Sequence, residues 1–454
     1  MTISVPDVSE PVPGAAPPDT PLRVQRRVLR VLLATQILYS MVIAMSGPVV
    51  ALLAERITGS ETRAGITQAA IFCGSVACAV PLSALSARHG RRYGLAVGQL
   101  VGALGAATVV AGSLLHSFVL VVIGAFGTGG AIAAGFQIRF AATDLAADDR
   151  HGRAVGMVTW ASTAGGVLGP SLVGITDRLV PGTFPEFTSP FLVIAAGLTG
   201  TAFLVYGLLR PDPLVLAREL AAARGEAVPA PPAKTKGKGK AGAGVRVGMR
   251  ILMRHRPARR AMVVSTTVHA VMITLMNMAS LHMHHGGVTV GLIGVAISFH
   301  VAGMYLPSPL VGILVDKYGA YRLFVSGLAL QFVAAGVLFA SPAGSAFGMG
   351  AGLLLLGVGW AAGFIAGSAA LSASLPVAER VPAQGACDLI IQAASSIGAL
   401  GAGLVVSLIS YAGLAALGGV AVLAVLVRLV WTGPYAEATA ADDTADDIKE
   451  TQAS

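Results

Sequence analysis

Apolar stretches of about twenty residues recur along almost the whole chain, and no other feature restricts its fold as much. The stretch 118–138, for example, contains no charged residue. A helix of about twenty residues crosses the ~30 Å hydrocarbon core of a bilayer and bonds its own backbone groups there. The composition agrees, with 55% hydrophobic and 12% charged residues and a mean hydropathy of +0.76. We therefore predict an all-α membrane protein that crosses the bilayer many times.

The apolar stretches predict twelve transmembrane helices in two sets of six. The spans are expected at 28–54, 64–85, 93–114, 118–138, 154–175, 190–209, 261–282, 289–311, 322–340, 347–370, 386–409 and 411–432. The chain would then consist of a disordered tail (1–27), a six-helix half (28–209), a basic linker (210–260), a second six-helix half (261–432) and an acidic disordered tail (433–454).

Lys and Arg collect on one side of the predicted membrane. The linker 210–260 contains thirteen Lys or Arg and three acidic residues, whereas the loops of the opposite side carry only Arg56, Arg63 and Arg178. By the positive-inside rule, the linker and both termini face the cytoplasm of a cell (inner) membrane. Lys234–Lys240 alternates Lys with Gly and Thr, which indicates a solvated linker rather than a nucleic-acid site.

The two predicted halves share sequence features at nearly one offset. Gly90 ends a basic loop after the second span, and Gly319 ends a similar loop after the eighth, 229 residues later. Small residues also recur at four-residue spacing, as Gly127, Ala131 and Gly135 in the fourth span and as Gly359, Gly363 and Gly367 in the tenth, 232 residues later. Small residues on one helix face permit close helix contacts. Parallel internal repeats of this kind are typical of transporters.

These features resemble the major facilitator superfamily over residues 25–432. The segment after the eighth span matches the family signature G-x-L-x-D-R-x-G-R-R, but in the first copy Ser83 replaces the first glycine and Ala87 replaces the acid. The resemblance implies two pseudo-symmetric six-helix halves, a monomer, and a cytoplasmic latch between the halves. The expected gate residues are Arg88, Gly90, Arg91, Arg92, Gly312, Asp316, Lys317 and Gly319.

The fifth span resembles the antiporter signature of that family, G-x8-G-x3-G-P-x2-G-G. It contains Gly156, Gly165, Gly169, Pro170 and Gly174, and departs from the signature at the position before the last glycine. Closely spaced glycines with a proline favour a kinked, tightly packed helix. In the family this signature accompanies export.

Two pairs of soft metal ligands lie in consecutive predicted spans. Met272 and Met276 are four residues apart, as are His300 and Met304, so each pair shares one helix face. Counted from the intervening loop, Met272 and His300 lie at the same depth, ~20 Å into the membrane. Thioether and imidazole groups suit copper(I). Packing is the alternative, because Met commonly fills helix interiors.

The same pairs resemble the M-x3-M and H-x3-M motifs of bacterial copper importers within the superfamily. The resemblance implies import of copper as substrate, with no resident cofactor. Riboflavin carriers resemble the same group, so uptake of a small organic molecule remains open. An entry path for the metal would contain His269, Met278, His282, Met283, His284 and His285.

Efflux of a drug or metabolite by proton antiport is the other alternative. The first two spans carry no acid, which disfavours a general multidrug antiporter. A polar relay could instead use Gln137, Arg139, Asp144 and Asp388. An enzyme is not expected, because the chain shows no catalytic triad, phosphate loop or carboxylate pair. A metal receptor would need an output domain, for which the linker is too short.

Overall fold

The computed structural model describes residues 20–59, 61–147, 149–179, 185, 187–225 and 240–433, and within them it is entirely helical apart from turns. Eleven segments of these residues are long and apolar enough to cross a membrane. The fifteen helices are α1 (Thr20–Thr58), α2 (Glu61–His89), α3 (Arg91–Leu114), α4 (Phe118–Thr143), α5 (His151–Leu179), α6 (Ser189–Leu208), α7 (Pro213–Ala223), α8 (Lys240–Arg254), α9 (Arg256–His285), α10 (Val290–Tyr305), α11 (Ser308–Tyr318), α12 (Ala320–Ala340), α13 (Ala346–Ala373), α14 (Val377–Leu408) and α15 (Tyr411–Trp431).

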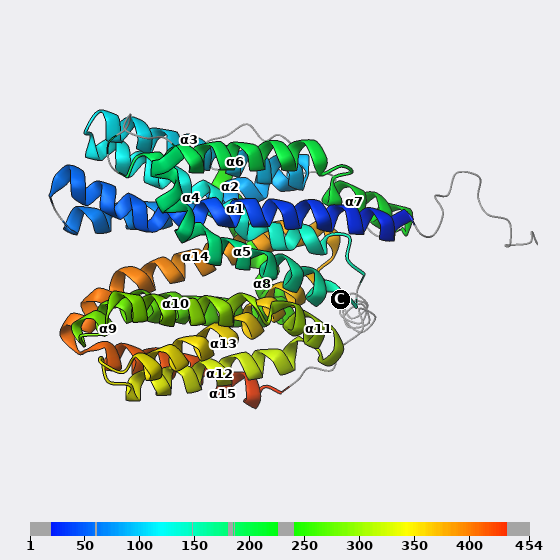
Figure 1. The fold of residues 1–454 in the computed structure, drawn as a ribbon. Helices are drawn as coiled ribbons and strands as arrows, with labels where there is room; N and C mark the ends of the chain where they lie inside the picture. Colours follow the sequence, from blue (N-terminus) through cyan, green and yellow to red (C-terminus); the bar gives the residue numbers. More distant parts are fainter. Residues whose placement is uncertain are drawn as a thin grey trace, which may run out of the picture.

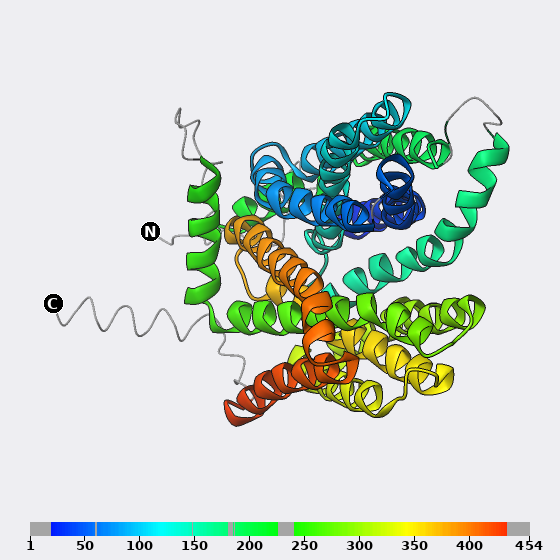
Figure 2. The ribbon, with the colours of Figure 1, turned by 90° about the vertical axis from the view of Figure 1, so that its left-hand side faces the viewer.

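The helices form two bundles that lie side by side, with their axes roughly parallel (Figure 1). Helices α1 to α6 make one bundle around a core that includes Leu32, Ile138 and Leu198. Helices α9 to α15 make the other around a core that includes Leu275, Leu356 and Ile391. Seen end-on, the two bundles occupy separate halves of the molecule (Figure 2). The predicted fold of two six-helix halves is confirmed.

We call one end of the molecule the basic end. It contains the joint between α2 and α3 at Gly90, the joint between α11 and α12 at Gly319, and the short helices α7 and α8. Figure 1 shows this end on the right. Gly90 and Gly319 have φ angles of 94° and 81°, which only glycine adopts readily, so both copies of the signature make the same tight helix joint.

Glycines bring helices into close contact at matching places in the two halves. A Cβ added at Gly127 of α4 would lie 2.8 Å from Cα of Gly105 on α3. One added at Gly359 of α13 would lie 2.9 Å from the carbonyl oxygen of Gly327 on α12. Lipid offers no hydrophobic driving force between helices, so such close packing supplies much of their association.

Several predicted boundaries are wrong. Helix α1 begins at Thr20, inside the expected tail 1–27, and the expected linker 210–260 contains α7, α8 and the first turn of α9. Residues 1–19, 226–239 and 434–454 lie outside the described residues. The eighth span is divided into α10 and α11 around Pro307, because proline cannot donate the backbone hydrogen bond that would continue the helix.

The halves meet mainly along two helix pairs. Helix α14 of the second half packs on α2 of the first, and α11 packs on α5. The two pairs are equivalent to each other under the repeat, because α2 corresponds to α11 and α5 corresponds to α14.

Candidate functional site

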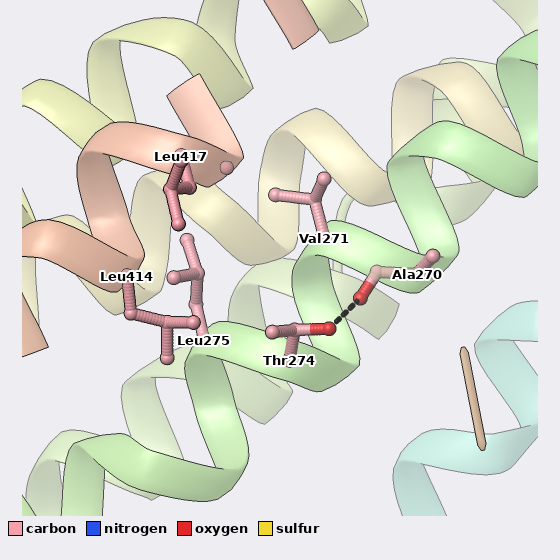
Figure 3. A pocket seen from close by; sticks show the side chains of 7 residues that line it. Ala270, Val271, Thr274, Leu275, Leu414 and Leu417 are labelled. Atoms are coloured by element: carbon pink, nitrogen blue, oxygen red, sulfur yellow. Dashed lines mark hydrogen bonds between the residues drawn. The ribbon is translucent and has the colours of Figure 1, made fainter. Parts of the chain in front are cut away.

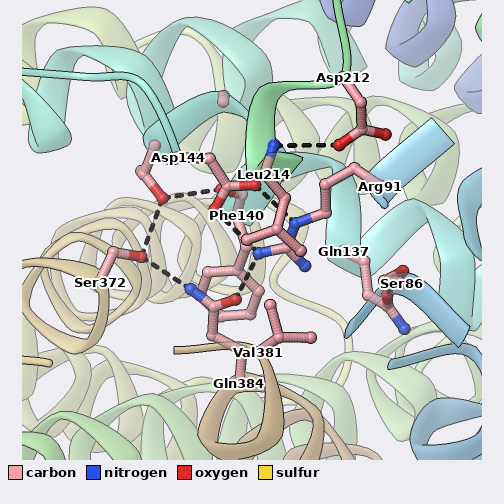
Figure 4. A network of polar contacts seen from close by, with 12 residues as sticks. Ser86, Arg91, Gln137, Phe140, Asp144, Asp212, Leu214, Ser372, Val381 and Gln384 are labelled. Carbon is pink, nitrogen blue, oxygen red and sulfur yellow. Dashed lines mark hydrogen bonds and ion pairs between the residues drawn. The ribbon is translucent and has the colours of Figure 1, made fainter. Parts of the chain in front are cut away.

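A buried arginine joins the halves at the basic end. The guanidinium of Arg91 forms two bonds with the carboxylate of Asp144, at 2.7 and 3.0 Å, and donates a third to Oε1 of Gln384 on α14, at 2.6 Å (Figure 4). Gln384 in turn donates to the hydroxyl of Ser372 on α13. Both charged side chains are 1% exposed. Arg91 was expected in the gate and Asp144 in a relay; the structure brings the two together.

A second ion pair crosses between the halves deeper in the molecule. Nη2 of Arg139 on α4 donates to Oδ1 of Asp388 on α14 at 2.5 Å, and Nε donates to the hydroxyl of Ser368 on α13 at 2.9 Å. The guanidinium also lies 4.3 to 5.0 Å from the centres of the Phe136, Phe140 and Phe364 rings. Because the pair is buried and spans both halves, separating the halves here would leave both charges unpaired.

The second signature copy caps a helix of the other half. Oδ1 of Asp316 accepts from the backbone N–H of Gly152 at 2.7 Å, and Oδ2 accepts from that of Arg153 at 3.0 Å. These donors form the first turn of α5, where a carboxylate is favoured by the unbonded N–H groups and the helix dipole. A Cβ at Gly312 would lie 2.4 Å from the carbonyl oxygen of Gly152, so the two helices touch through their backbones.

The first signature copy makes a different contact, as the loss of its acid at Ala87 predicts. Instead, the hydroxyl of Ser83 donates to the carbonyl oxygen of Val381 on α14 at 2.8 Å. Asp212 lies beside Gly90 and accepts from the backbone N–H of Arg92 at 2.8 Å, within the first half. The second copy thus contributes a capping carboxylate to the interface, whereas the first contributes a hydroxyl and Arg91.

The other expected gate and relay residues stay within one half. Arg88 is exposed, and Arg92 lies over the rings of Tyr93 and Tyr206 at 5.3 and 4.9 Å. Lys317 is exposed and lies over the Tyr318 ring. Gln137 donates to the carbonyl oxygen of Ala79 and accepts from Ser86, so it ties α4 to α2.

Aromatic rings from both halves gather at the centre of the molecule. Trp360 and Phe364 of α13 stack with centroids 4.7 Å apart at an interplanar angle of 18°. His269 of α9 lies 5.4 Å from Phe364 and also 5.4 Å from Phe136, which belongs to the first half. Nε1 of Trp360 donates to Nδ1 of His269 at 2.8 Å. We call Phe136, His269, Trp360 and Phe364 the aromatic cluster.

The aromatic cluster lies near mid-depth and adjoins the ion pair of Arg139. Trp360 precedes the end of α13 by thirteen residues and His269 follows the start of α9 by thirteen, which places both ~20 Å from the basic end. At about the same depth, Gln392 of α14 donates to the hydroxyl of Ser75 on α2 at 2.5 Å. The contact of the halves therefore extends from the basic end to the level of the cluster.

The two expected metal-ligand pairs are buried but lie on helices that share α13 as a neighbour. Met272 and Met304 are 1% and 7% exposed, and Met276 is half-buried against the same core. Nδ1 of His300 is 2.7 Å from the carbonyl oxygen of Leu353, so this nitrogen carries the proton. Nε2 is then an acceptor, buried and without a hydrogen-bond partner among the described residues.

The residues of the expected entry path differ in their exposure and in their contacts. His284 and His285 are exposed and Met278 is half-buried, but Met283 is fully buried in the core. The ring of His282 stacks on Tyr411 with centroids 4.5 Å apart, and His269 is bonded to Trp360. The described residues contain no group of three or more His, Cys, Asp or Glu arranged to hold a metal.

The antiporter-like glycines pack α5 against two helices. A Cβ at Gly156 would lie 2.4 Å from the carbonyl oxygen of Ser308 on α11. Cβ atoms at Gly165 and Gly169 would instead meet Ser40 and Ala44 of α1. Helix α5 continues through Pro170 and Gly174. The motif therefore serves close packing at an inter-half contact and inside the first half.

An apolar groove between α9 and α15 offers little for solute recognition. It has a volume of about 140 Å³, and the hydroxyl of Thr274 in its wall is already bonded to the carbonyl oxygen of Ala270 at 2.7 Å (Figure 3). The lining residues are Ala270, Val271, Thr274, Leu275, Leu414, Leu417 and Gly418. Apart from Thr274, the residues that line the groove have no polar side chain.

Several residues that the structure brings together carry only a weak signal in the sequence. Trp360 and Phe364 lie in a glycine-rich apolar span, and their four-residue spacing was the available sign of a shared helix face. Gln384 and Gln392 lie where the eleventh span was expected to begin, and polar residues at membrane depth were the signal. Asp212 precedes a proline that starts α7, which is a recognisable cap.

Comparison with known proteins places the chain in a family. The model of the Major Facilitator Superfamily matches residues 32–290. An uncharacterized MFS-type transporter of Bacillus subtilis, YdeG, is 32% identical over 91% of this chain and 94% of its own length. The riboflavin transporter RfnT of Brucella anthropi is 29% identical over 69% of this chain and 72% of its own length.

A solved structure agrees at the level of the fold. A bacterial homologue of the iron transporter ferroportin, in an outward-facing state, superposes with a TM-score of 0.66 at 15% identity. The match covers 90% of this chain and all of that one. The family match, the YdeG similarity and the two-bundle architecture agree. This chain belongs to the major facilitator superfamily.

Proposed function

We propose that the protein is a gradient-driven transporter of a small planar aromatic molecule, such as a flavin, in the cell membrane. Its basic end faces the cytoplasm, in accord with the positive-inside rule. The described contacts between the halves concentrate at that end, which supports a state closed toward the cytoplasm. Transport then requires the halves to separate at the basic end and meet at the other, around a site near mid-depth.

The aromatic cluster is the single observation that carries the substrate class. It combines stacked rings of one half with Phe136 of the other, at the depth where solute sites of such transporters lie. Planar rings bind flat solutes by offset or edge-on stacking. When the halves move, the distance between the rings of Phe136 and Phe364 changes, so a bound solute would make different contacts in the two states. The similarity to a riboflavin transporter supports this class.

Polar groups beside the cluster would orient such a solute. Arg139 donates to Ser368 and Asp388 and lies over the Phe364 ring, which places N–H donors and a carboxylate next to an aromatic face. A heteroaromatic ring with carbonyl and N–H groups would find partners of both kinds there. This combination favours a heteroaromatic solute over a purely apolar one.

Uptake of labelled riboflavin tests the proposal. Cells that lack their own riboflavin carrier and express the protein should accumulate riboflavin, and Trp360→Ala should reduce apparent affinity by about 5- to 150-fold, the range of one lost aromatic stack of ~1–3 kcal/mol. Trp431→Ala is the matched control, because Trp431 is 90% exposed on the outer surface of α15. Equal uptake in both variants, at equal membrane abundance, would rule out the cluster as the site.

Copper import is the second candidate, and His300 is the observation that favours it. A metal-binding imidazole typically donates one N–H to a backbone carbonyl and presents the other nitrogen to the metal. His300 has this arrangement, with Nδ1 on Leu353 and a buried, unpartnered Nε2. Copper uptake that is lost in His300→Ala, but kept in Trp360→Ala, would identify the metal as substrate. Met157→Ala, at a 40% exposed methionine, controls for methionine loss in a parallel Met304→Ala test.

A further inference from the structure

A groove between α1 and α6 opens at the outer surface of the first half, near the basic end. It has a volume of about 410 Å³. Arg27, Val31 and Ala34 form its α1 side at spacings of four and three residues, so they share one face of that helix. Arg30 adds a second guanidinium, and the α6 side is formed by Leu204 and Leu208, again four residues apart.

The groove straddles the edge of the predicted hydrocarbon layer. On α1, Arg30 is the last charged residue before the apolar run that continues to Glu55. On α6, Leu204 and Leu208 precede Arg210, which ends a run without charged residues that starts at Ser189. The two arginines therefore lie at headgroup level, and the four apolar residues lie at or just below it.

We propose that this groove binds one anionic phospholipid. The phosphate lies between Arg27 and Arg30, and the start of one acyl chain lies along Val31, Ala34, Leu204 and Leu208. Basic pockets between transmembrane helices on the cytoplasmic side suit anionic headgroups. The lining residues include no acid, so the charge of the groove is complementary to a phosphate.

The guanidinium groups of Arg27 and Arg30 keep N–H donors for the headgroup of a phospholipid. Both arginines are exposed, and the described bond of Arg30, from Nε to the carbonyl oxygen of Arg26 at 3.4 Å, uses one of the five N–H donors of its guanidinium. Guanidinium groups bind phosphate through paired N–H donors. The apolar half of the groove distinguishes a lipid from free phosphate, because only a lipid covers Leu204 and Leu208.

Thermal unfolding of the purified protein in detergent, with phosphatidylglycerol, phosphatidylcholine or inorganic phosphate added, tests this site. Phosphatidylglycerol should raise the unfolding temperature, since a ligand of the folded state stabilises it. Phosphatidylcholine and inorganic phosphate should not. Arg27→Gln/Arg30→Gln should weaken phosphatidylglycerol binding by about 30-fold, at about a fivefold loss for each arginine near the membrane surface.

Arg23→Gln/Arg26→Gln is the matched control, with the same charge loss on the same helix outside the groove. It should retain nearly full binding. Leu204→Trp keeps both charges but fills the apolar part, and should also reduce binding. An equal loss in the control pair, equal stabilisation by inorganic phosphate, or unchanged binding in Leu204→Trp would overturn the proposal. Leu204→Trp keeps the test decisive even if the Arg27→Gln/Arg30→Gln variant does not fold.

Discussion

The ion pair between Arg139 and Asp388 makes the sharpest prediction about the conformational equilibrium. Asp388→Asn removes one charge but keeps the shape of the side chain and one acceptor oxygen. Breaking a buried ion pair from one side costs ~3–5 kcal/mol, because the remaining charge stays buried and unpaired. Arg139 keeps its bonds to Ser368 and to the carbonyl oxygen of Phe136, so we expect the lower limit.

Asp388→Asn therefore destabilises the state in which the halves meet at the basic end, because α4 and α14 belong to different halves. A loss of ~3 kcal/mol changes a two-state equilibrium by about 150-fold. A closed population of about 100 to 1 would therefore fall to near equality. Arg139→Gln/Asp388→Asn should restore much of the closure, because removing both charges together leaves neither of them unpaired.

Distances between spin labels measure the effect. Labels at His89→Cys and Ala373→Cys, both exposed at the basic end, report the separation of the halves once Cys73, Cys78 and Cys387 are replaced. Asp388→Asn should add a longer-distance population, and the double variant should largely remove it. Glu379→Gln is the matched control, since this acid of α14 pairs with His255 of the same half. An unchanged distance distribution in Asp388→Asn would refute the reasoning.

Two further substitutions test the contact of α11 with α5. Gly312→Val should force the helices apart and open the basic end, because its Cβ would lie 2.4 Å from the carbonyl oxygen of Gly152. The same spin labels should then report a longer distance. Gly336→Ala is the control and should leave the distances unchanged, because its Cβ would meet nothing within 4 Å. Asp316→Asn should weaken closure by ~1–2 kcal/mol, since an amide caps the first turn of α5 less well than a carboxylate. Its effect on the distances should be smaller than that of Asp388→Asn. A larger effect of Asp316→Asn would contradict the expectation that the ion pair of Arg139 and Asp388 stabilises the closed state more than the Asp316 cap does.

The architecture could be predicted from the sequence because its signals are local. Apolar length determines which segments can cross the membrane, and Gly90 and Gly319 mark equivalent helix joints in the two halves. The ends of the helices were harder to predict from the sequence. Helix α1 starts within a polar segment, and α14 starts nine residues before its predicted span. Hydropathy locates the part of a helix in lipid, whereas the helix itself continues into water.

The site was only partly predictable because its contacts join residues far apart in the chain. Arg139 and Asp388 were identified separately as polar residues at membrane depth, but their pairing depends on how the halves dock. Sequence spacing predicts that His300 shares one helix face with Met304, but it could not show that α13 lies beside both α9 and α10. The four-residue spacing of Trp360 and Phe364 indicates a shared helix face, but the same spacing is typical of aromatic residues that only pack in an apolar span.

The most direct test of the account is the fluorescence of Trp360 during solute binding. The chain has three tryptophans, and Trp160 and Trp431 are 48% and 90% exposed, so Trp160→Phe/Trp431→Phe leaves Trp360 as the sole tryptophan. Titration of that purified variant with riboflavin should quench Trp360 emission saturably, with Phe364→Leu shifting the midpoint to higher concentration. Quenching that rises linearly without saturation, or a midpoint that Phe364→Leu does not change, would contradict a binding site at the aromatic cluster.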